Sequence, residues 1–369
     1  MRILFLEPFM GGSHKAFLKG LMANSEHNIV SLTMPATHWK WRLHGGALAM
    51  AEKVKDLEGD FDLIVASSMT HLPAFIALTN PRFATTPKLL YMHENQLTQP
   101  APPGEEKDVA HGYVNYLSAL VADKLVFTSR FHFEDFIEEL PHFLKRFPDF
   151  QNLSSVRDIE AKSEVLHPGI NLKAFDAQPD TRRKNKYPVI VWNQKWSHDR
   201  NPALFFRTMN RLDDAGLKFD LILAGDNRHD KPEEFEKAWQ RYGRRIIHYG
   251  YVEDFDVYSK LLHMGDIIVS TARFEFFCTS IMEGVYCGCH PILPNELTYP
   301  EIIPQNLHKP LLHAPVFYNN ADELFHAMKD LLTGDTKVLP KSSLRSINKN
   351  LDWSRMIYKY DQLFESMVG

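Results

Sequence analysis

The sequence predicts an α/β protein built from two doubly wound parallel sheets. Short apolar runs alternate with longer segments of helical character, which is typical of buried parallel strands joined by crossover helices. The runs fall into two series, RILFLEP, NIVSLTM, FDLIVASS, KLLYMH and KLVFTS, and then PVIVWN, DLILAG, IIHYG and DIIVST. The length of 369 residues fits two domains at roughly 150 residues each.

The two series place the domain boundaries. Residues 1–178 are expected to form the N-terminal domain, 179–187 (PDTRRKNKY) a polar, basic linker, and 188–342 the C-terminal domain. Residues 343–369 contain apolar positions at near-helical spacing, which predicts a C-terminal helix that packs back across the domains. Because open α/β sheets bind ligands at the carboxyl ends of their strands, we expect an active site in a central cleft that both domains face.

The composition is that of an ordinary globular protein. Hydrophobic residues make up 44% and charged residues 24% of the chain. No apolar run approaches the roughly 20 residues that cross a bilayer, so no integral membrane protein is expected. The opening MRILFLEPFM is interrupted by Glu7 and predicts a strand instead of a signal peptide. Three cysteines in one short stretch suit a reducing compartment, which favours the cytoplasm.

The first strand is followed by FMGGSHK. It is expected to end at Glu7 or Pro8, with Gly11 and Gly12 in the turn and Ser13 as the N-cap of the next helix. Such a turn could offer N–H groups to a phosphate or a sugar, but it lacks the spacing of the known phosphate-binding loops. An ordinary tight turn between strand and helix explains it equally well.

Two polar segments of the first half are candidate sites. Trp39, Lys40, Trp41 and Arg42 interleave aromatic and basic residues, which could stack a nucleobase and hold its phosphate, or could pack one Trp in the core. His93, Glu94 and Asn95 directly follow the KLLYM strand, where ligands bind. His93 could bind a sugar hydroxyl and Glu94 could act as a base, or the cluster could cap backbone groups.

The second half holds a basic loop and a pair of carboxylates. Lys195 and Arg200 follow the PVIVW strand and could neutralise a diphosphate, or could be solvated charges. Glu275 and Glu283 follow the DIIVST strand with seven residues between them. If a helix begins near Cys278 or Thr279, both carboxylates could bind the diols of one sugar nucleotide, and the helix N-terminus could bind its phosphate. Alternatively, Glu275 and Glu283 are two solvated charges of a helix.

These segments together resemble a known family. The Glu275 to Glu283 spacing, with Lys195 and Arg200 upstream, is similar to the E-x7-E donor site of glycosyltransferase family 4, retaining enzymes of the GT-B fold with two Rossmann-like domains. FMGGSHK, HWKWR, MHENQ, EFF with EGVYCGC, and YPEI resemble the tRNA-queuosine alpha-mannosyltransferase family. The resemblance spans both domains. Lys195 and Cys278 stand where family 4 enzymes commonly have Arg and Gly.

The resemblance implies roles for these residues. On the donor side, Glu283 would bind the ribose, Glu275 the sugar hydroxyls, Lys195 and Arg200 the diphosphate, and the backbone amides of Phe276, Phe277, Cys278 and Thr279 the phosphate and sugar. His93 would lie beside the donor sugar, and Gly11, Gly12 and His14 in the loop opposite the donor, where the two glycines would contribute to donor binding and His14 to acceptor binding. Trp39, Lys40, Trp41, Arg42, Glu94 and Asn95 would serve the acceptor.

The function that the resemblance implies is transfer of mannose from GDP-mannose to queuosine in tRNA. The partners would be a queuosine-containing tRNA and the sugar nucleotide, with no cofactor. No metal is expected, because the sequence has no convincing DxD loop and no set of His and Cys at zinc-ligand spacing. A lipid or polysaccharide acceptor, and a sugar-nucleotide- or RNA-binding protein without turnover, are the alternatives.

Overall fold

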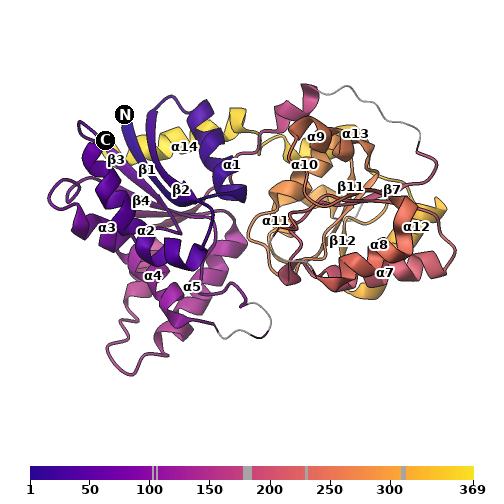
Figure 1. Ribbon diagram of the computed structural model, residues 1–369, viewed down its shortest axis with the longest axis horizontal. Coiled ribbons are helices and arrows are strands. Elements are labelled where there is room, and N and C mark those ends of the chain that lie inside the picture. Colours follow the sequence, from indigo (N-terminus) through magenta and orange to yellow (C-terminus); the bar gives the residue numbers. More distant parts are fainter. Residues whose placement is uncertain (102–103, 105–106, 178–184, 229–231, 309–312) are drawn as a thin grey trace. The chain divides into compact units, whose positions relative to one another are not determined.

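The chain folds into two compact units. The computed structural model describes residues 1–101, 104, 107–177, 185–228, 232–308 and 313–369. Unit 1 consists of Met1–Ile170 together with Trp353–Gly369, and unit 2 of Asn171–Asp352. In Figure 1 unit 1 runs from indigo to magenta and includes the yellow C-terminal helix, whereas most of unit 2 is drawn in shades of orange.

A six-stranded parallel sheet forms the centre of unit 1, in the order β2-β1-β3-β4-β5-β6. Its strands are β1 (Arg2–Met10), β2 (Asn28–Pro35), β3 (Leu63–Ser67), β4 (Lys88–Met92), β5 (Lys124–Phe127) and β6 (Ser163–Val165). The winding direction changes between β1 and β3, because β2 and β3 lie on opposite sides of β1. Ligands of doubly wound sheets bind at this switch point, beyond the carboxyl ends of the strands.

Helices cover both faces of this sheet (Figure 1). They are α1 (Gly12–Asn24), α2 (Trp39–Lys53), the short η1 (Val54–Asp56), α3 (Leu72–Leu78), α4 (Val109–Val121), α5 (Arg130–Leu144), α6 (Ser155–Ala161) and α14 (Trp353–Val368). Because side chains alternate along β1, Ile3 and Phe5 pack with α1 and α14, whereas Leu4 and Leu6 pack with residues of α2 to α5.

The last helix completes the core of unit 1. Trp353 begins α14 and is buried against Gly20 of α1 and against Gly169. A Cβ atom at Gly20 would lie 1.9 Å from the Trp353 ring, so glycine is what allows this approach. Further along, the Tyr360 hydroxyl donates to the carbonyl oxygen of His167 at 3.0 Å. The end of the chain is therefore an integral part of the first unit.

Unit 2 contains a second parallel sheet in the order β12-β11-β10-β7-β8-β9. Its strands are β7 (Val189–Trp192), β8 (Asp220–Leu223), β9 (Ile246–Tyr249), β10 (Ile267–Val269), β11 (His290–Pro294) and β12 (Phe317–Tyr318). The order reverses between β7 and β10, which places the switch point of this sheet at the loops that follow those two strands.

The helices of unit 2 pack on an aromatic core in which Trp196 stacks on Phe235 at 3.6 Å between ring centroids. They are η2 (Leu172–Ala177), η3 (His198–Arg200), α7 (Pro202–Asp214), α8 (Glu233–Tyr242), η4 (Gly243–Arg245), α9 (Phe255–Met264), α10 (Thr279–Cys287), α11 (Tyr299–Ile302), η5 (Gln305–Leu307), α12 (Ala321–Thr333) and α13 (Lys341–Asn348). No helix in the described part of the chain is long and apolar enough to cross a membrane.

The units divide at other positions than the sequence predicts. The first boundary lies between Ile170 and Asn171, ahead of the expected linker at 179–187, of which residues 179–184 lie outside the described part. The C-terminal segment 343–369 forms two helices, not one. The buried Asn348 donates to the carbonyl oxygen of Met282 at 2.6 Å and fixes α13 in unit 2, whereas α14 belongs to unit 1.

Candidate active site

In unit 2, the loops after β7 and β10 are tied together at the switch point. The Thr271 hydroxyl donates to the carbonyl oxygens of Arg200 and Asn201 at 2.9 and 3.1 Å. The backbone N–H of Arg273 donates to the carbonyl oxygen of Asp199 at 2.8 Å. These bonds bring Arg200 beside the segment that carries Glu275. Lys195 lies in the same loop, and its side chain is exposed.

Arg200 and Glu275 form a largely buried ion pair. The Arg200 Nη2 atom lies 3.2 Å from each carboxylate oxygen of Glu275, and Nη1 lies 3.3 Å from Asp199 and donates to the carbonyl oxygen of Phe274. Burial raises the pKa of Glu275 to about 7 although the charge of Arg200 opposes the shift. The structure thus brings together Arg200, which the sequence predicts to bind the diphosphate, and Glu275, which it predicts to bind the sugar.

Glu283 is held by two residues that the sequence did not single out. Helix α10 begins at Thr279, as predicted, so Glu275 precedes the helix and Glu283 lies within it. The Tyr258 hydroxyl, from α9, donates to Glu283 Oε2 at 2.8 Å. Asn193 in turn donates to the Tyr258 hydroxyl at 3.1 Å and to the carbonyl oxygen of Ser280 at 2.7 Å. Burial raises the pKa of Glu283 to about 7.

The start of α10 suits an anion. Phe276 and Cys278 are buried, and Phe277 and Thr279 are partly exposed. Cys278 occupies the N-cap position, and among the described residues no side chain caps this end of the helix. The first turn also contains no acidic residue. The positive end of the helix dipole is therefore not neutralised by a side chain of this turn, and a phosphate would be stabilised there.

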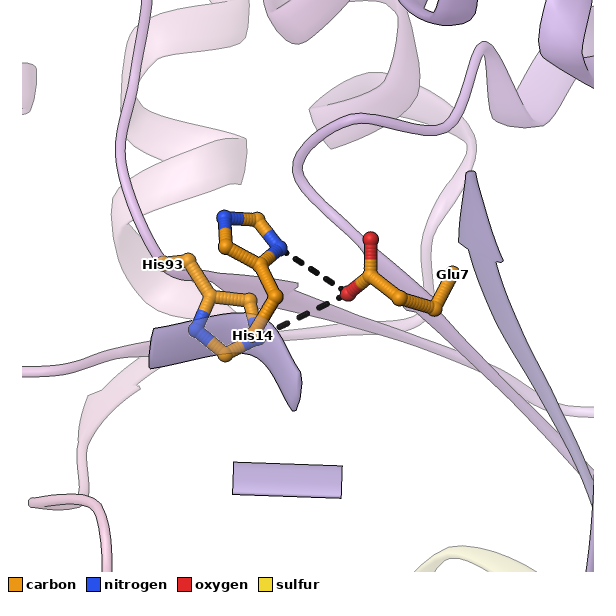
Figure 2. A group of neighbouring side chains, drawn as sticks. All are labelled: Glu7, His14 and His93. Carbon is orange, nitrogen blue, oxygen red and sulfur yellow. Dashed lines mark hydrogen bonds and ion pairs between the residues drawn. The ribbon is translucent and has the colours of Figure 1, made fainter. Parts of the chain in front are cut away.

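In unit 1, side chains from β1, α1 and the loop after β4 meet at the switch point. Glu7 is fully buried, and its Oε1 accepts from the Ser67 hydroxyl at 3.1 Å and from the backbone N–H of Phe9 at 2.9 Å. Its Oε2 lies 2.9 Å from His14 Nδ1 and 3.8 Å from His93 Nε2. Figure 2 shows both rings directed at this one oxygen.

His14 also contacts Glu94. Its Nε2 lies 3.0 Å from Glu94 Oε2, so each ring nitrogen of His14 meets a carboxylate. Burial by itself would lower the pKa of His14, but Glu7 and Glu94 outweigh it and raise the pKa well above 6.5. His93 stacks on His14 with 4.0 Å between ring centroids. Burial, followed by the charges of His14 and His132, lowers the pKa of His93 well below 6.5.

Glu7, His14 and His93 are also the group that comes nearest to a metal-binding set among the described residues. Their ligand atoms all lie within 4.8 Å of one another. The His14 and His93 rings are stacked at an interplanar angle of 29°, and a nitrogen of each ring faces the same carboxylate of Glu7. Both nitrogens of His14 are also taken by carboxylates. The arrangement fits a bound proton better than a bound cation.

The glycine turn differs from the prediction in detail. Strand β1 continues past Pro8 to Met10, because it pairs with β2 again after a register shift that follows Glu7. Helix α1 then begins at Gly12 with Gly11 as its N-cap, so Ser13 is not the cap. Gly12 has φ 51°. A Cβ atom at Gly11 would lie 2.3 Å from the Cβ of Ala36, so the turn needs glycine for close packing.

The remaining predicted acceptor residues divide into buried and exposed groups. Asn95 is fully buried, and its Oδ1 accepts from Leu97 and Thr98, so its side chain shapes the loop after β4. Arg42 donates to the Pro35 carbonyl and to the Thr37 hydroxyl, which secures the entry to α2. Lys40 is exposed.

The two tryptophans at the start of α2 differ in exposure. Trp39 is half-buried and packs against the cluster of Leu43, Met69 and Val114. Trp41, in contrast, is 66% exposed. One tryptophan therefore serves the core while the other presents its ring on the surface next to the exposed Lys40.

Glu7, Ser67, Asn193 and Tyr258 are the site residues that the sequence interpretation missed. Glu7 had a signal, because a carboxylate inside the apolar run RILFLEP needs a buried partner. The other three have no local signal, since their importance depends on which strands and helices become neighbours.

Comparisons with known proteins identify two families that match the chain. Residues 2–170 match the family described as tRNA-queuosine alpha-mannosyltransferase N-terminal, and residues 175–350 match glycosyl transferases group 1. The Drosophila melanogaster tRNA-queuosine alpha-mannosyltransferase is 34% identical over 311 residues, which cover 82% of each chain.

Solved structures share the fold at low sequence identity. Sucrose-phosphate synthase from Thermosynechococcus elongatus has a TM-score of 0.72 at 14% identity and covers 99% of both chains. The Anabaena protein HepE in complex with UDP-glucose has a TM-score of 0.70 at 13% identity, and covers 99% of this chain and all of its own. Two parallel sheets with this topology and the two matched families confirm the predicted GT-B glycosyltransferase fold. The chain belongs to the tRNA-queuosine alpha-mannosyltransferase family.

Proposed function

We propose that this glycosyltransferase moves mannose from GDP-mannose to a cyclopentene hydroxyl of queuosine in the anticodon loop of a tRNA, with retention of configuration. The observation that carries the proposal is the extent of the match to a named tRNA-queuosine alpha-mannosyltransferase, which spans 82% of the chain. In this proposal unit 2 binds the donor and unit 1 binds the acceptor.

Glu283 and Glu275 are proposed to bind the two diols of the donor. A carboxylate can accept two hydrogen bonds side by side, so Glu283, fixed by Tyr258, suits the ribose and Glu275 suits the sugar. Arg200, Lys195 and the start of α10 are proposed to neutralise the diphosphate, both in the bound donor and as it departs. Arg200 would then share its guanidinium between the diphosphate and Glu275.

The acceptor is proposed to meet the loop after β4 and the start of α2. Glu94 presents a carboxylate to a hydroxyl, and the exposed ring of Trp41 with Lys40 suits a base and a phosphate of an RNA loop. His93 is proposed to correspond to the family histidine that lies beside the donor sugar. Retention would follow from front-face attack in which the leaving phosphate accepts the acceptor proton.

The decisive experiment uses radiolabelled GDP-mannose and total tRNA from cells that make queuosine and from cells that lack it. Label confined to the queuosine-containing tRNA, together with a mannosyl-queuosine nucleoside in mass spectrometry, is the expected result. Label in neither pool, with donor binding intact, would contradict the queuosine acceptor. Labelling of a lipid extract instead would establish the membrane-surface alternative.

The donor assignment has its own test. Glu275→Ala is expected to lower the transfer rate by at least roughly 100-fold, because it removes a hydrogen-bonding partner at the reacting sugar and one of the two carboxylates beside Arg200. Circular dichroism should show the fold unchanged. Glu296→Ala, on the surface of the same unit, is the control and should retain full activity. Full activity of Glu275→Ala would overturn the site assignment.

No metal ion is included in this proposal, since Arg200, Lys195 and the helix N-terminus supply the positive charge. Treatment with EDTA followed by gel filtration is therefore expected to leave the rate of transfer unchanged. A loss of activity that Mg²⁺ or Mn²⁺ restores would show that a cation shares the diphosphate, and would contradict this part of the mechanism.

A further inference from the structure

His14 lies between two carboxylates that come from distant parts of the chain. Its Nδ1 lies 2.9 Å from Glu7 Oε2, and its Nε2 lies 3.0 Å from Glu94 Oε2. A neutral imidazole has a single N–H group and can donate only one of these two hydrogen bonds. When both carboxylates are ionised, they can only accept, so both bonds form together only if the ring carries a proton on each nitrogen.

The surroundings of His14 favour that proton. The groups that face it are Glu7 on β1, His93 and Glu94 after β4, and Phe9 and Phe17, whose rings pack beside the two histidines. His132 on α5 acts on His93. His93 stacks on His14, and burial lowers the pKa of His93 well below its usual range, so of the two rings His14, with a carboxylate at each nitrogen, is the one suited to hold an extra proton.

The hydrogen bonds that link Glu7, His14 and Glu94 run from a fully buried carboxylate, Glu7, to a partly exposed one, Glu94. Glu7 is fully buried, and Ser67 and the Phe9 N–H hold its other oxygen. Of Glu7 and Glu94, only Glu94 is appreciably exposed, with 26% of its side chain accessible to solvent. His14 itself is 4% exposed. A ligand that reaches this edge of the sheet therefore meets Glu94 and not the imidazole.

We propose that His14 is a positioning residue, a doubly protonated imidazolium anchored by Glu7, that fixes the carboxylate of Glu94 to accept hydrogen bonds from the hydroxyl groups of the acceptor. This proposal rests on the proposed function, because the acceptor hydroxyls come from it. It changes the expected role of His14, which does not contact the acceptor. It also assigns a role to Glu7, whose side chain is fully buried.

The protonation state can be observed directly. The full-length protein, labelled with ¹⁵N at histidine, is studied by long-range ¹H–¹⁵N correlation at pH 7.5, and the His14 signals are assigned by their loss in His14→Asn. Two protonated ring nitrogens are expected for His14. His132, whose pKa burial lowers well below 6.5, is the internal control and should show one. A single protonated nitrogen at His14, or one equivalent of zinc in the purified protein, would overturn the proposal.

A kinetic experiment tests what the imidazolium does. Loss of the His14 proton breaks one of its two bonds, so kcat/KM for the tRNA acceptor should fall as pH rises through the raised pKa of His14. Glu7→Gln removes one of the charges that raise this pKa, so the alkaline fall should move to lower pH and KM for the acceptor should rise roughly tenfold. KM for GDP-mannose should not change. Glu52→Gln, an exposed residue of unit 1, is the matched control.

The outcomes separate the two proposals. An alkaline fall that stays in place in Glu7→Gln would show that His14 does not govern it and would contradict the positioning role. If the wild-type protein labels no queuosine-containing tRNA, the proposed function fails, whereas the NMR experiment still decides whether His14 is an imidazolium. If Glu7→Gln does not fold, the wild-type spectrum remains decisive.

Discussion

At the scale of single residues, both units bury carboxylates close to the switch points of their sheets. Glu7 has hydrogen-bond partners at both oxygens, Glu275 faces Arg200, and Glu283 accepts from Tyr258. Burial of a charged group opposes folding unless it is well compensated. The raised pKa values of Glu275 and Glu283, about 7 each, show that their compensation is incomplete. Such groups are expected where a ligand completes the hydrogen bonds.

Glu283→Gln is therefore expected to stabilise the protein in the absence of ligand. Glu283 titrates near 4.5 when unfolded and near 7 when folded, so the folded state binds more protons between these values. The free energy of unfolding then falls as pH rises through this window, by about 1 to 3 kcal/mol. The glutamine does not titrate and can still accept from Tyr258.

Thermal melting of both proteins at pH 5 and pH 8 measures this effect. The melting temperature of Glu283→Gln should exceed that of the wild type more at pH 8 than at pH 5. The variant should nevertheless bind GDP-mannose more weakly. An equal difference at both pH values would show that Glu283 has an ordinary pKa.

At the scale of elements, the hydrogen bonds between α9, α10 and the loop after β7 set the orientation of Glu283. Tyr258→Phe removes one hydroxyl and leaves the carboxylate without its donor. Because hydrogen bonds to charged groups contribute about 1.5 to 3 kcal/mol, Kd for GDP-mannose is expected to rise roughly 10- to 150-fold. Isothermal titration calorimetry would measure it. Tyr286→Phe, which loses a similar 2.8 Å bond to Asp176, is the control and should bind normally.

A second element, α14, should be needed for the stability of unit 1. Trp353→Ala removes a buried indole that packs against Gly20 and Gly169, and is expected to cost about 3 to 5 kcal/mol. Urea unfolding followed by circular dichroism would measure the loss. Tyr358→Ala, on the same helix with its ring 64% exposed, should change stability by less than about 0.5 kcal/mol. Equal stability of the two variants would contradict the packing role of α14.

Much of the fold could be predicted from the sequence, because apolar runs mark buried strands. All nine runs correspond to strands, β1 to β5 and β7 to β10. The nine apolar runs do not include β6, β11 and β12. Of these, β6 and β12 span three and two residues at sheet edges, too short for a period to be recognised. The sequence also does not predict that unit 1 combines Met1–Ile170 with Trp353–Gly369, because the spacing of apolar residues along a helix does not show which sheet the helix covers.

The candidate site was predictable only in part. The positions of Glu275 and Glu283 around the start of α10 follow from the local pattern, and that helix begins where expected. The bond between His14 and Glu94 joins residues 80 positions apart, and depends on β1 and β4 both flanking β3. Tyr258 reaches Glu283 from a neighbouring helix in the same way. Such pairs are properties of the tertiary structure, which a single sequence does not display.

At the scale of the whole molecule, the formal charge of −4 requires that any binding of tRNA be local. Lys40 at the start of α2 is the exposed candidate beside Trp41. Lys40→Gln is expected to weaken binding and to reduce the slope of log Kd against log salt by about 0.7 to 0.9, the value for one phosphate contact. Filter binding at several salt concentrations measures the slope. Lys237→Gln, in unit 2, should leave the slope unchanged.

The return of α14 to unit 1 has a consequence for the newly made protein. During synthesis the first 170 residues leave the ribosome long before the helix that covers Ile3, Phe5, Leu63 and Val65. All of unit 2 is translated in between, which takes roughly 10 to 35 s at about 5 to 20 residues per second. For that time one face of the nascent sheet is apolar and incompletely covered. The N-terminal unit is thus expected to bind chaperones during this interval, and the docking of α14 is expected to complete its core.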